Sequence, residues 1–234
     1  MAAGPGDTLR VTISRSDPTA QRKFVIWRRQ PMAVLDVLSD IQRWHDPTLA
    51  FRWSCRIAMC GTCTVRIDGR PVLACQTPVE PERKTLMIEP LGGFPVVRDL
   101  IVDPQPFVER WQRVAPAFLA AADLAEPAVI APSSAERQTI EPLLDCITCG
   151  ACYAACAVSG AEAPFLGPAA LARSLALITD SREGAGEDRL SAVAADDGID
   201  SCHQIGACTA VCPKGVDPAG AIRLLRRRRL GMGA

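Results

Sequence analysis

The sequence of 234 residues has few aromatic side chains, no long apolar run and no net charge. Aromatic residues make up only 5% of the chain, so large side chains contribute little to any core. No stretch reaches the roughly 18 apolar residues of a membrane-spanning helix. Lys and Arg together number 26, as do Asp and Glu, which excludes a nucleic-acid binder with a dominant basic field. We therefore expect a folded globular chain that meets a membrane only through a partner and binds no nucleic acid.

Cysteine, in contrast, is abundant: the chain has 11, gathered in groups. A secreted disulfide scaffold normally has an even number of cysteines and a secretory signal, whereas the opening MAAGPGDTL has no basic-then-apolar pattern. The odd number and the grouping indicate thiol ligands for metal in a reducing compartment. Metal–thiolate bonds would also stabilise a fold with few large apolar side chains.

The first hundred residues predict β-strands around one helix. Apolar residues in Met32–Ile41 recur at helical spacing. Asp68-Gly69 predicts a tight hairpin, because Gly tolerates a positive φ. Runs of strand-forming residues lie at Leu9–Ile13, Phe24–Trp27, Thr64–Ile67, Val72–Ala74 and Thr85–Glu89. Strands wrapped around one helix, with a cysteine-rich loop before the hairpin, indicate a β-grasp domain.

The pattern changes after Pro95, where helical segments alternate with Pro and Gly. These segments are Phe107–Leu119, Ser134–Asp145, Pro168–Thr179, Arg189–Ala195 and Pro218–Arg229. Within this half, Cys146–Cys156 and Cys202–Cys212 have equal length and similar spacing, which is typical of a two-cluster ferredoxin core. We expect an α+β protein with two domains, 1–105 and 106–234, the second all-α and similar to bacterial ferredoxins.

The first cysteine group has a C-x4-C-x2-C spacing with a fourth cysteine downstream, the plant-type ferredoxin pattern for a [2Fe–2S] cluster. Its members are Cys55, Cys60, Cys63 and Cys75. Gly61 permits the loop to curl so that thiolates converge, and the hairpin brings Cys75 back toward the loop. Four cysteines can also bind zinc, which is the alternative for this group.

The second group is a C-x2-C-x2-C-x3-C run of the kind that holds a cubane cluster. In two-cluster proteins the fourth cysteine of such a run binds the other cluster. Cys156 is therefore assigned to the third centre, and Cys212 takes its place here. We expect a [4Fe–4S] cluster on Cys146, Cys149, Cys152 and Cys212.

The third group repeats this run with Ile205 at the position of the second cysteine. Only Cys156, Cys202 and Cys208 remain for this centre, and an isoleucine cannot bind iron. Three thiolates predict a [3Fe–4S] cluster, and a [4Fe–4S] cluster with a non-cysteine fourth ligand is the alternative. Four, four and three ligands account for every cysteine of the chain.

The order of the three centres and the motifs around them resemble the iron–sulfur subunit of succinate dehydrogenase and fumarate reductase. The motifs are SCR-x3-CGTC, DGRPVLAC, RDLIVD, CITCGACYAAC and CHQIGACTAVCPKG, and the resemblance covers nearly the whole chain. It implies an electron-transfer subunit with no organic substrate chemistry of its own. It also implies a flavoprotein partner with covalent FAD that interconverts succinate and fumarate. Membrane anchor subunits would hold a quinone beside the third cluster, with the chain on the cytoplasmic side of the inner membrane.

Two departures from the family pattern concern the quinone and the first cluster. Ala157 stands where many members have Pro, and no Trp follows, which resembles the menaquinone-linked members. Ala58 stands where Gly is usual in the first cluster loop. A quinone pocket is expected from Pro164, Phe165, His203 and Ile205.

Several features have alternative interpretations. His203 suits either a contact with quinone or a bond to nearby backbone. The run Arg226–Arg229 suits either an acidic partner or lipid surface, or a helix end whose charge complements the helix dipole. For the whole chain, the alternatives are an electron-transfer subunit of another flavoprotein reductase with a non-quinone acceptor, and a zinc-stabilised interaction module.

Overall fold

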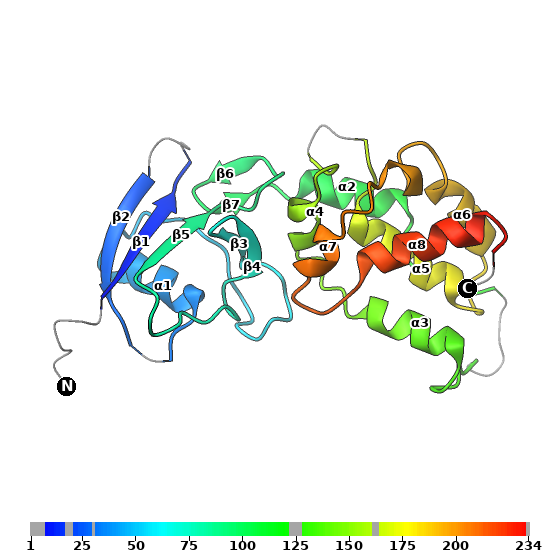
Figure 1. The fold of residues 1–234 in the computed structure, drawn as a ribbon, viewed down its shortest axis with the longest axis horizontal. Coiled ribbons are helices and arrows are strands. Elements are labelled where there is room, and N and C mark those ends of the chain that lie inside the picture. The colour runs from blue at the N-terminus through cyan, green and yellow to red at the C-terminus, as the bar shows by residue number, and fades with distance from the viewer. Residues whose placement is uncertain (1–7, 17–20, 30, 122–127, 161–163, 233–234) are drawn as a thin grey trace. The chain divides into compact units, whose positions relative to one another are not determined.

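The computed structural model describes residues 8–16, 21–29, 31–121, 128–160 and 164–232 (Figure 1). The chain divides into two compact units, Met1–Asp103 and Pro104–Ala234. The domain boundary predicted from the sequence, between residues 105 and 106, lies two residues after the end of the first unit. The predicted domains 1–105 and 106–234 stay a prediction.

The N-terminal unit contains a five-stranded mixed sheet and the helix α1, Val34–Trp44 (Figure 1). In the strand order β2-β1-β5-β3-β4, the β1–β5 pair is parallel and the other pairs are antiparallel. The strands are β1 (Thr8–Ser14), β2 (Gln21–Trp27), β3 (Thr64–Ile67), β4 (Arg70–Leu73) and β5 (Thr85–Glu89). A mixed sheet of this order with one helix is the β-grasp arrangement, which confirms the predicted fold.

Period-two alternation in β1 and helical periodicity in α1 supply the core of this unit. Leu9, Val11 and Ile13 are fully buried on one face of the sheet. The buried residues of α1 are Val34, Leu35, Val37, Leu38 and Ile41. The predicted hairpin is present, because Asp68 and Gly69 both have positive φ between β3 and β4.

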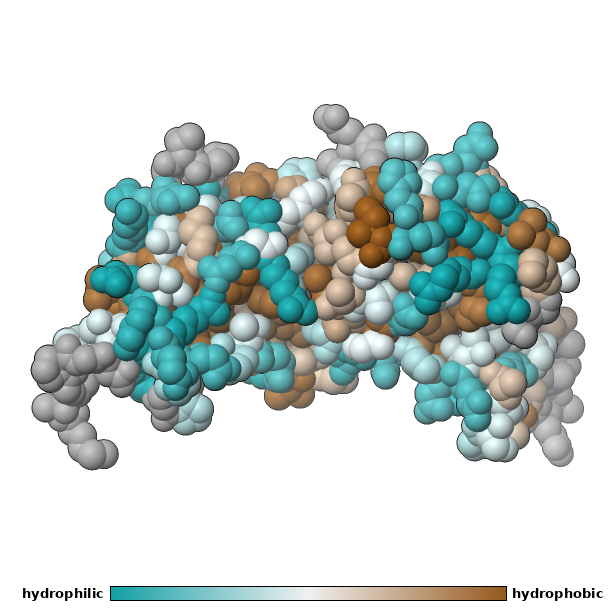
Figure 2. Space-filling model, viewed as in Figure 1, coloured by the Kyte–Doolittle hydropathy of each residue, from teal (hydrophilic) through white to brown (hydrophobic). Residues whose placement is uncertain are grey.

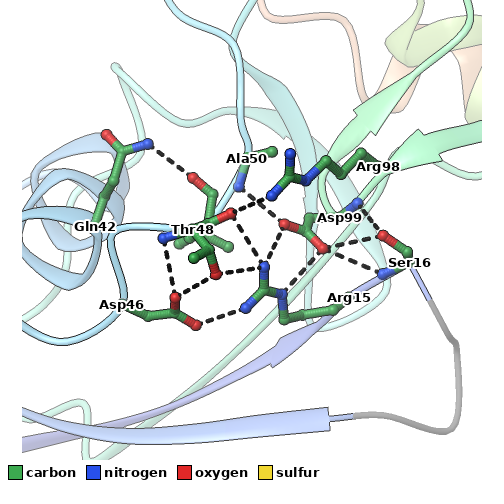
Figure 3. Close-up of polar contacts among 9 residues, drawn as sticks. Arg15, Ser16, Gln42, Asp46, Thr48, Ala50, Arg98 and Asp99 are labelled. Carbon is green, nitrogen blue, oxygen red and sulfur yellow. Dashed lines mark hydrogen bonds and ion pairs between the residues drawn. The ribbon is translucent and has the colours of Figure 1, made fainter.

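A network of charged and polar groups holds the end of β1 to two loops of the same unit (Figure 3). Asp99 is only 2% exposed, and its carboxylate accepts hydrogen bonds from Arg15 Nε at 3.0 Å and Nη2 at 2.8 Å. It also accepts from Ser16 and from the backbone N–H of Ala50 at 2.9 Å. Arg15 donates further to Asp46 at 2.6 Å. Ala50 begins the segment that leads into the first cysteine loop, so this network anchors the base of that loop.

The hydrogen bonds also decide the protonation of the Asp99 carboxyl. Burial alone would raise the pKa of Asp99, but hydrogen bonds from Arg15, Ala50 and Ser16 outweigh it and lower the pKa to about 2. The group is therefore a carboxylate at neutral pH and carries the charge that Arg15 requires.

The C-terminal unit is helical and packs around α5, Pro168–Thr179. The helix starts at a Pro, which suits the first helical position, and nine of its residues are buried. The other elements are α2 (Gln105–Arg113), α3 (Ala135–Leu144), α4 (Ala151–Ala155), α6 (Gly186–Val193), the 3₁₀ turn η1 (Ile199–Ser201), α7 (Ala207–Ala210) and α8 (Pro218–Arg229). Helices α2, α3, α4, α6 and α8 all contact α5, so one apolar core supports both later cysteine groups.

Some elements differ from the sequence prediction. Helix α2 ends at Arg113 and not at Leu119, because Ala115 takes a positive φ of 45° before Pro116. The hairpin of β6 (Val96–Arg98) and β7 (Ile101–Val102) was not predicted. Nor were α4 and α7, which are only one turn long and contain Cys152 and Cys208.

Candidate metal centres

The first cysteine loop curls through three left-handed residues. Arg56, Ala58 and Gly61 have φ of 59°, 56° and 71°. The curl turns backbone N–H groups toward sulfur: Ile57 and Met59 donate to Cys55 Sγ at 3.4 and 3.3 Å. Ala58 adopts a conformation that favours glycine, which gives a physical reason for Gly being usual at this position.

The remaining ligand positions of this group differ in environment. Burial raises the pKa of the Cys63 thiol to about 11. Hydrogen bonds from the Cys55 backbone and from the Thr62 hydroxyl, 3.1 Å away, lower the pKa of Cys60 to about 6. The hairpin brings Cys75 back, since Ala74 N–H donates to the Cys63 carbonyl at 3.1 Å. The loop therefore stabilises negative charge at one sulfur while shielding another from water, as a cluster with bound thiolates requires.

The second set of cysteines surrounds one hollow in the helical unit. Cys146, Cys149 and Cys152 line it together with Cys212, which is distant in sequence. The hollow holds about 410 Å³ of space, part of it open to solvent. Its remaining walls are largely apolar: Ile147, Ala169, Ala172, Pro213, Val216 and Pro218. Burial raises the pKa of Cys146 and, further, that of Cys152, so both would lose a proton on binding iron.

The third set surrounds a second hollow of about 360 Å³. Its cysteines are Cys156, Cys202 and Cys208. Three of the four residues predicted for a quinone pocket line the same hollow, namely Phe165, His203 and Ile205. Pro164 is not among the lining residues; its carbonyl accepts a bond from Arg113 at 3.4 Å.

The backbone repeats itself around the two hollows. In the first, Thr148 and Gly150 have φ of 51° and 78° on either side of Cys149. In the second, Gln204 and Gly206 have φ of 59° and 81° on either side of Ile205. One-turn helices, α4 and α7, follow at the same distance. Ile205 therefore occupies the backbone position of Cys149, in the one corner that has no thiol.

The two hollows lie close together, because α4 and α7 pack against each other. The pKa of Cys152 in α4 is raised by burial and also by negative charge on neighbouring thiols, among them Cys208 in α7. Thiols of the two sets thus lie within electrostatic range of each other. Redox groups in the two hollows would be near neighbours.

Sequence reasoning missed the groups that hold Cys202. Gln204 donates to Cys202 Sγ from its backbone at 3.4 Å and from Nε2 at 3.6 Å. Arg226 of α8 donates to the Cys202 carbonyl at 2.7 Å. Nothing in the sequence indicates the left-handed conformation of Gln204. The arginine run is evident in the sequence, but the carbonyl that Arg226 bonds is not.

The described residues contain neither a compact site for a single metal ion nor a membrane-spanning helix. In the part of the chain that the structure describes, no three His, Cys, Asp or Glu side chains come together as a site for one metal ion. The same residues include no helix both long and apolar enough to cross a membrane.

Both cysteine-bearing regions are similar to known iron–sulfur domains. Residues 9–109 match the model of a 2Fe-2S iron-sulfur cluster binding domain, and residues 142–216 match that of a 4Fe-4S dicluster domain. The fumarate reductase iron-sulfur subunit of Mycobacterium tuberculosis (strain CDC 1551 / Oshkosh) is 41% identical over 213 residues, which cover 89% of this chain and 85% of that one. This chain belongs to the family of iron–sulfur subunits of fumarate reductase and succinate dehydrogenase.

Further relatives of this family agree in sequence and in fold. The succinate dehydrogenase [ubiquinone] iron-sulfur subunit 2, mitochondrial, of Oryza sativa subsp. japonica is also 41% identical, over 82% of this chain and 63% of that one. The solved Mycobacterium smegmatis Sdh1 complex in the apo form contains a chain with a TM-score of 0.84, 26% identity and 95% coverage of each chain. Relatives named for fumarate reductase and for succinate dehydrogenase are both 41% identical to this chain, so the family includes subunits of both names.

Membership in this family establishes the kind of subunit that the chain is and the two types of cluster-binding domain that it contains. The chain is an electron-transfer subunit of a multi-subunit succinate dehydrogenase or fumarate reductase complex, with one [2Fe–2S] binding domain and one dicluster domain. The predicted family and fold class are confirmed, and a zinc-stabilised interaction module does not fit.

Proposed function

We propose that this subunit passes single electrons between an FAD-bearing flavoprotein and a membrane quinone through [2Fe–2S], [4Fe–4S] and [3Fe–4S] clusters. The observation that carries the proposal is the hollow with three thiols and Ile205 in the fourth corner. A two-electron oxidation of succinate at the flavin would release two electrons, delivered singly, and two electrons with two protons would convert quinone to quinol. The reverse flow would reduce fumarate.

The proposed ligands follow the three sets that the structure brings together. Each set combines thiols with backbone donors, and apolar residues line the hollows of the second and third sets, which fits clusters bound through thiolates. The sets are Cys55, Cys60, Cys63 and Cys75 for [2Fe–2S], Cys146, Cys149, Cys152 and Cys212 for [4Fe–4S], and Cys156, Cys202 and Cys208 for [3Fe–4S].

Residues of this chain determine how such clusters would work. When bound, iron–sulfur clusters supply one-electron redox chemistry at potentials set by charge, hydrogen bonds and exposure. N–H groups of Ile57, Met59 and Gln204 point at sulfur and would stabilise the more negative, reduced state. Packing of α4 on α7 keeps the second and third sets close, which suits transfer between them.

The acceptor side is assigned to the third hollow. Ile205 is 66% exposed and His203 is also exposed, so this hollow has one side open to a partner. We place the quinone, of the menaquinone type, on the side of this hollow that Phe165, His203 and Ile205 line, held there by membrane anchor subunits. Pro164, which precedes Phe165 in the chain, stays a predicted contact. The chain would then sit on the cytoplasmic side of the inner membrane, bound to the flavoprotein and the anchor.

Replacing Ile205 with Cys tests the proposal. Because Ile205 lies between two left-handed residues as Cys149 does, the new thiol should reach the empty corner and convert the third cluster toward [4Fe–4S]. We expect loss of the oxidised-state EPR signal of that cluster and a potential lower by at least about 59 mV, a tenfold change in its one-electron equilibrium. The measurement is an EPR redox titration of the purified complex.

Ile205→Ala is the matched control, since it removes the same side chain without adding a ligand. It should keep the oxidised-state signal. An Ile205→Cys complex whose oxidised signal and potential equal those of the wild type would overturn the three-thiolate assignment.

A further inference from the structure

The arginine run of α8 is bonded mainly to its own chain. Figure 2 shows hydrophilic side chains gathered over α8. Arg228 donates to the Ile178 carbonyl at 3.0 Å, and Arg229 donates to the Asp200 carboxylate at 3.0 Å. Arg226 donates to backbone carbonyls of the segment that ends at Cys202. These bonds favour neither of the two interpretations made from the sequence, because Arg226, Arg228 and Arg229 bond to groups of their own chain.

Arg226 makes the densest set of these contacts. Its Nε and Nη2 donate to the Ile199 carbonyl at 3.0 and 2.6 Å, and Nη2 donates to the Cys202 carbonyl at 2.7 Å. The acceptors belong to η1 and to Cys202, the residue that caps it, and the Ile199 carbonyl also accepts the backbone N–H of Cys202 at 3.4 Å. A planar guanidinium can bond several carbonyls at once, which an ammonium does less well.

Arg226 and Arg229 share a single carboxylate. Asp200 is the nearest carboxylate, with Oδ1 4.0 Å from Arg226 Nε. That carboxylate is already paired with Arg229, on the same helix. Two arginines and one aspartate therefore stand beside the third cysteine set, which leaves an excess of one positive charge there.

We propose that Arg226 is a positioning residue for the third cluster: it fixes the backbone of Cys202 and holds a positive charge beside that ligand. This inference rests on the proposed role of Cys202 as a cluster ligand. A cation near a cluster favours the reduced form, which carries one more negative charge, and so raises the potential. Arg226 would thereby make the last cluster of the chain a better electron acceptor.

The test is an EPR redox titration of the complex carrying Arg226→Gln or Arg226→Lys. Glutamine removes both the charge and the fork of donors, and we expect the one-electron equilibrium of the third cluster to shift about tenfold toward the oxidised form, about 59 mV. Lysine keeps the charge with a less suitable donor geometry and should give an intermediate potential with an altered oxidised-state signal. The potentials of the other two clusters should not move.

Arg223→Gln is the matched control on the same helix, because Arg223 pairs at 3.6 Å with the exposed Asp217 and not with Cys202. It should leave the third cluster unchanged. A wild-type potential and signal in Arg226→Gln would overturn the inference. If the Gln variant loses its fold, wild-type behaviour of Arg226→Lys in both readouts overturns it instead. If the wild-type complex itself lacks the three-iron signal, the proposed function fails. That result is distinct from a failure of the inference about Arg226, which requires a wild-type signal that the variant leaves unchanged.

Discussion

Replacing Cys212 with Ala should abolish the [4Fe–4S] cluster and leave the [3Fe–4S] cluster in place. Replacing Cys156 with Ala should do the reverse, although each cysteine stands in sequence next to the other set. The reason is the crossed arrangement, in which Cys212 lines the hollow of Cys146, Cys149 and Cys152, and Cys156 lines the hollow of the third set.

EPR spectra of the two complexes, oxidised and then reduced, give the measurement. The Cys212→Ala complex should keep the oxidised-state signal and lose the reduced-state signal of the cubane. Each variant is the control for the other, because both remove one thiol from the same unit. The opposite pattern, with the oxidised signal lost in Cys212→Ala alone, would show that each run of cysteines serves its own cluster.

Replacing Asp99 with Asn should destabilise the N-terminal unit by about 3–5 kcal/mol, the usual cost of removing one partner from a buried ion pair. Asp99 is 2% exposed, and the Arg15 side chain is 16% exposed, so the guanidinium would remain without its main counter-charge. For a unit of this size the apparent unfolding temperature should fall by more than about 10 °C. Heating followed by far-UV circular dichroism and by cluster absorbance measures both the fold and the first cluster.

Asp40→Asn is the matched control. Asp40 pairs at 3.0 Å with Arg29, whose side chain is 62% exposed, and such surface pairs contribute about 0–1 kcal/mol. Equal unfolding temperatures for the Asp99 and Asp40 variants would contradict the role of the network in Figure 3.

The same carboxylate predicts an acid dependence. The pKa of Asp99 is about 2 in the folded chain, below the roughly 3.9 of an unfolded aspartate. Its contribution is therefore complete above about pH 4 and is lost as the pH falls through the folded value. The advantage of the wild type over Asp99→Asn should shrink by about 2–3 kcal/mol over that range. Urea midpoints, read from tryptophan fluorescence directly after transfer to each pH, check this; a constant difference would contradict it.

Much of the fold could be predicted because local signals agreed with the tertiary structure. Thr85–Glu89, Pro168–Thr179 and Pro218–Arg229 have the predicted bounds, the two helices each beginning at a Pro. The early end of α2 depends on the left-handed Ala115, which propensity does not reveal. Single-turn helices α4 and α7 have too few residues for a periodic signal.

For the candidate sites too, some features could be predicted from the sequence and others could not. Cysteine spacing predicted which thiols share a hollow, since the chain between ligands limits where they can reach. The contacts that adjust those sites come from distant positions: Asp99 supports the stem of the first loop, and Arg226 bonds the Cys202 carbonyl. Charged side chains can reach many carbonyls, and only the packed structure shows which one they meet.

The central claim is that this chain carries three iron–sulfur clusters, the last of them with three irons. An EPR redox titration of the wild-type complex tests it most directly. We expect one signal in the oxidised state, from [3Fe–4S], and two that appear on reduction, from [2Fe–2S] and [4Fe–4S]. A complex with no oxidised-state signal, whose third centre behaves as a second [4Fe–4S] cluster, would contradict it.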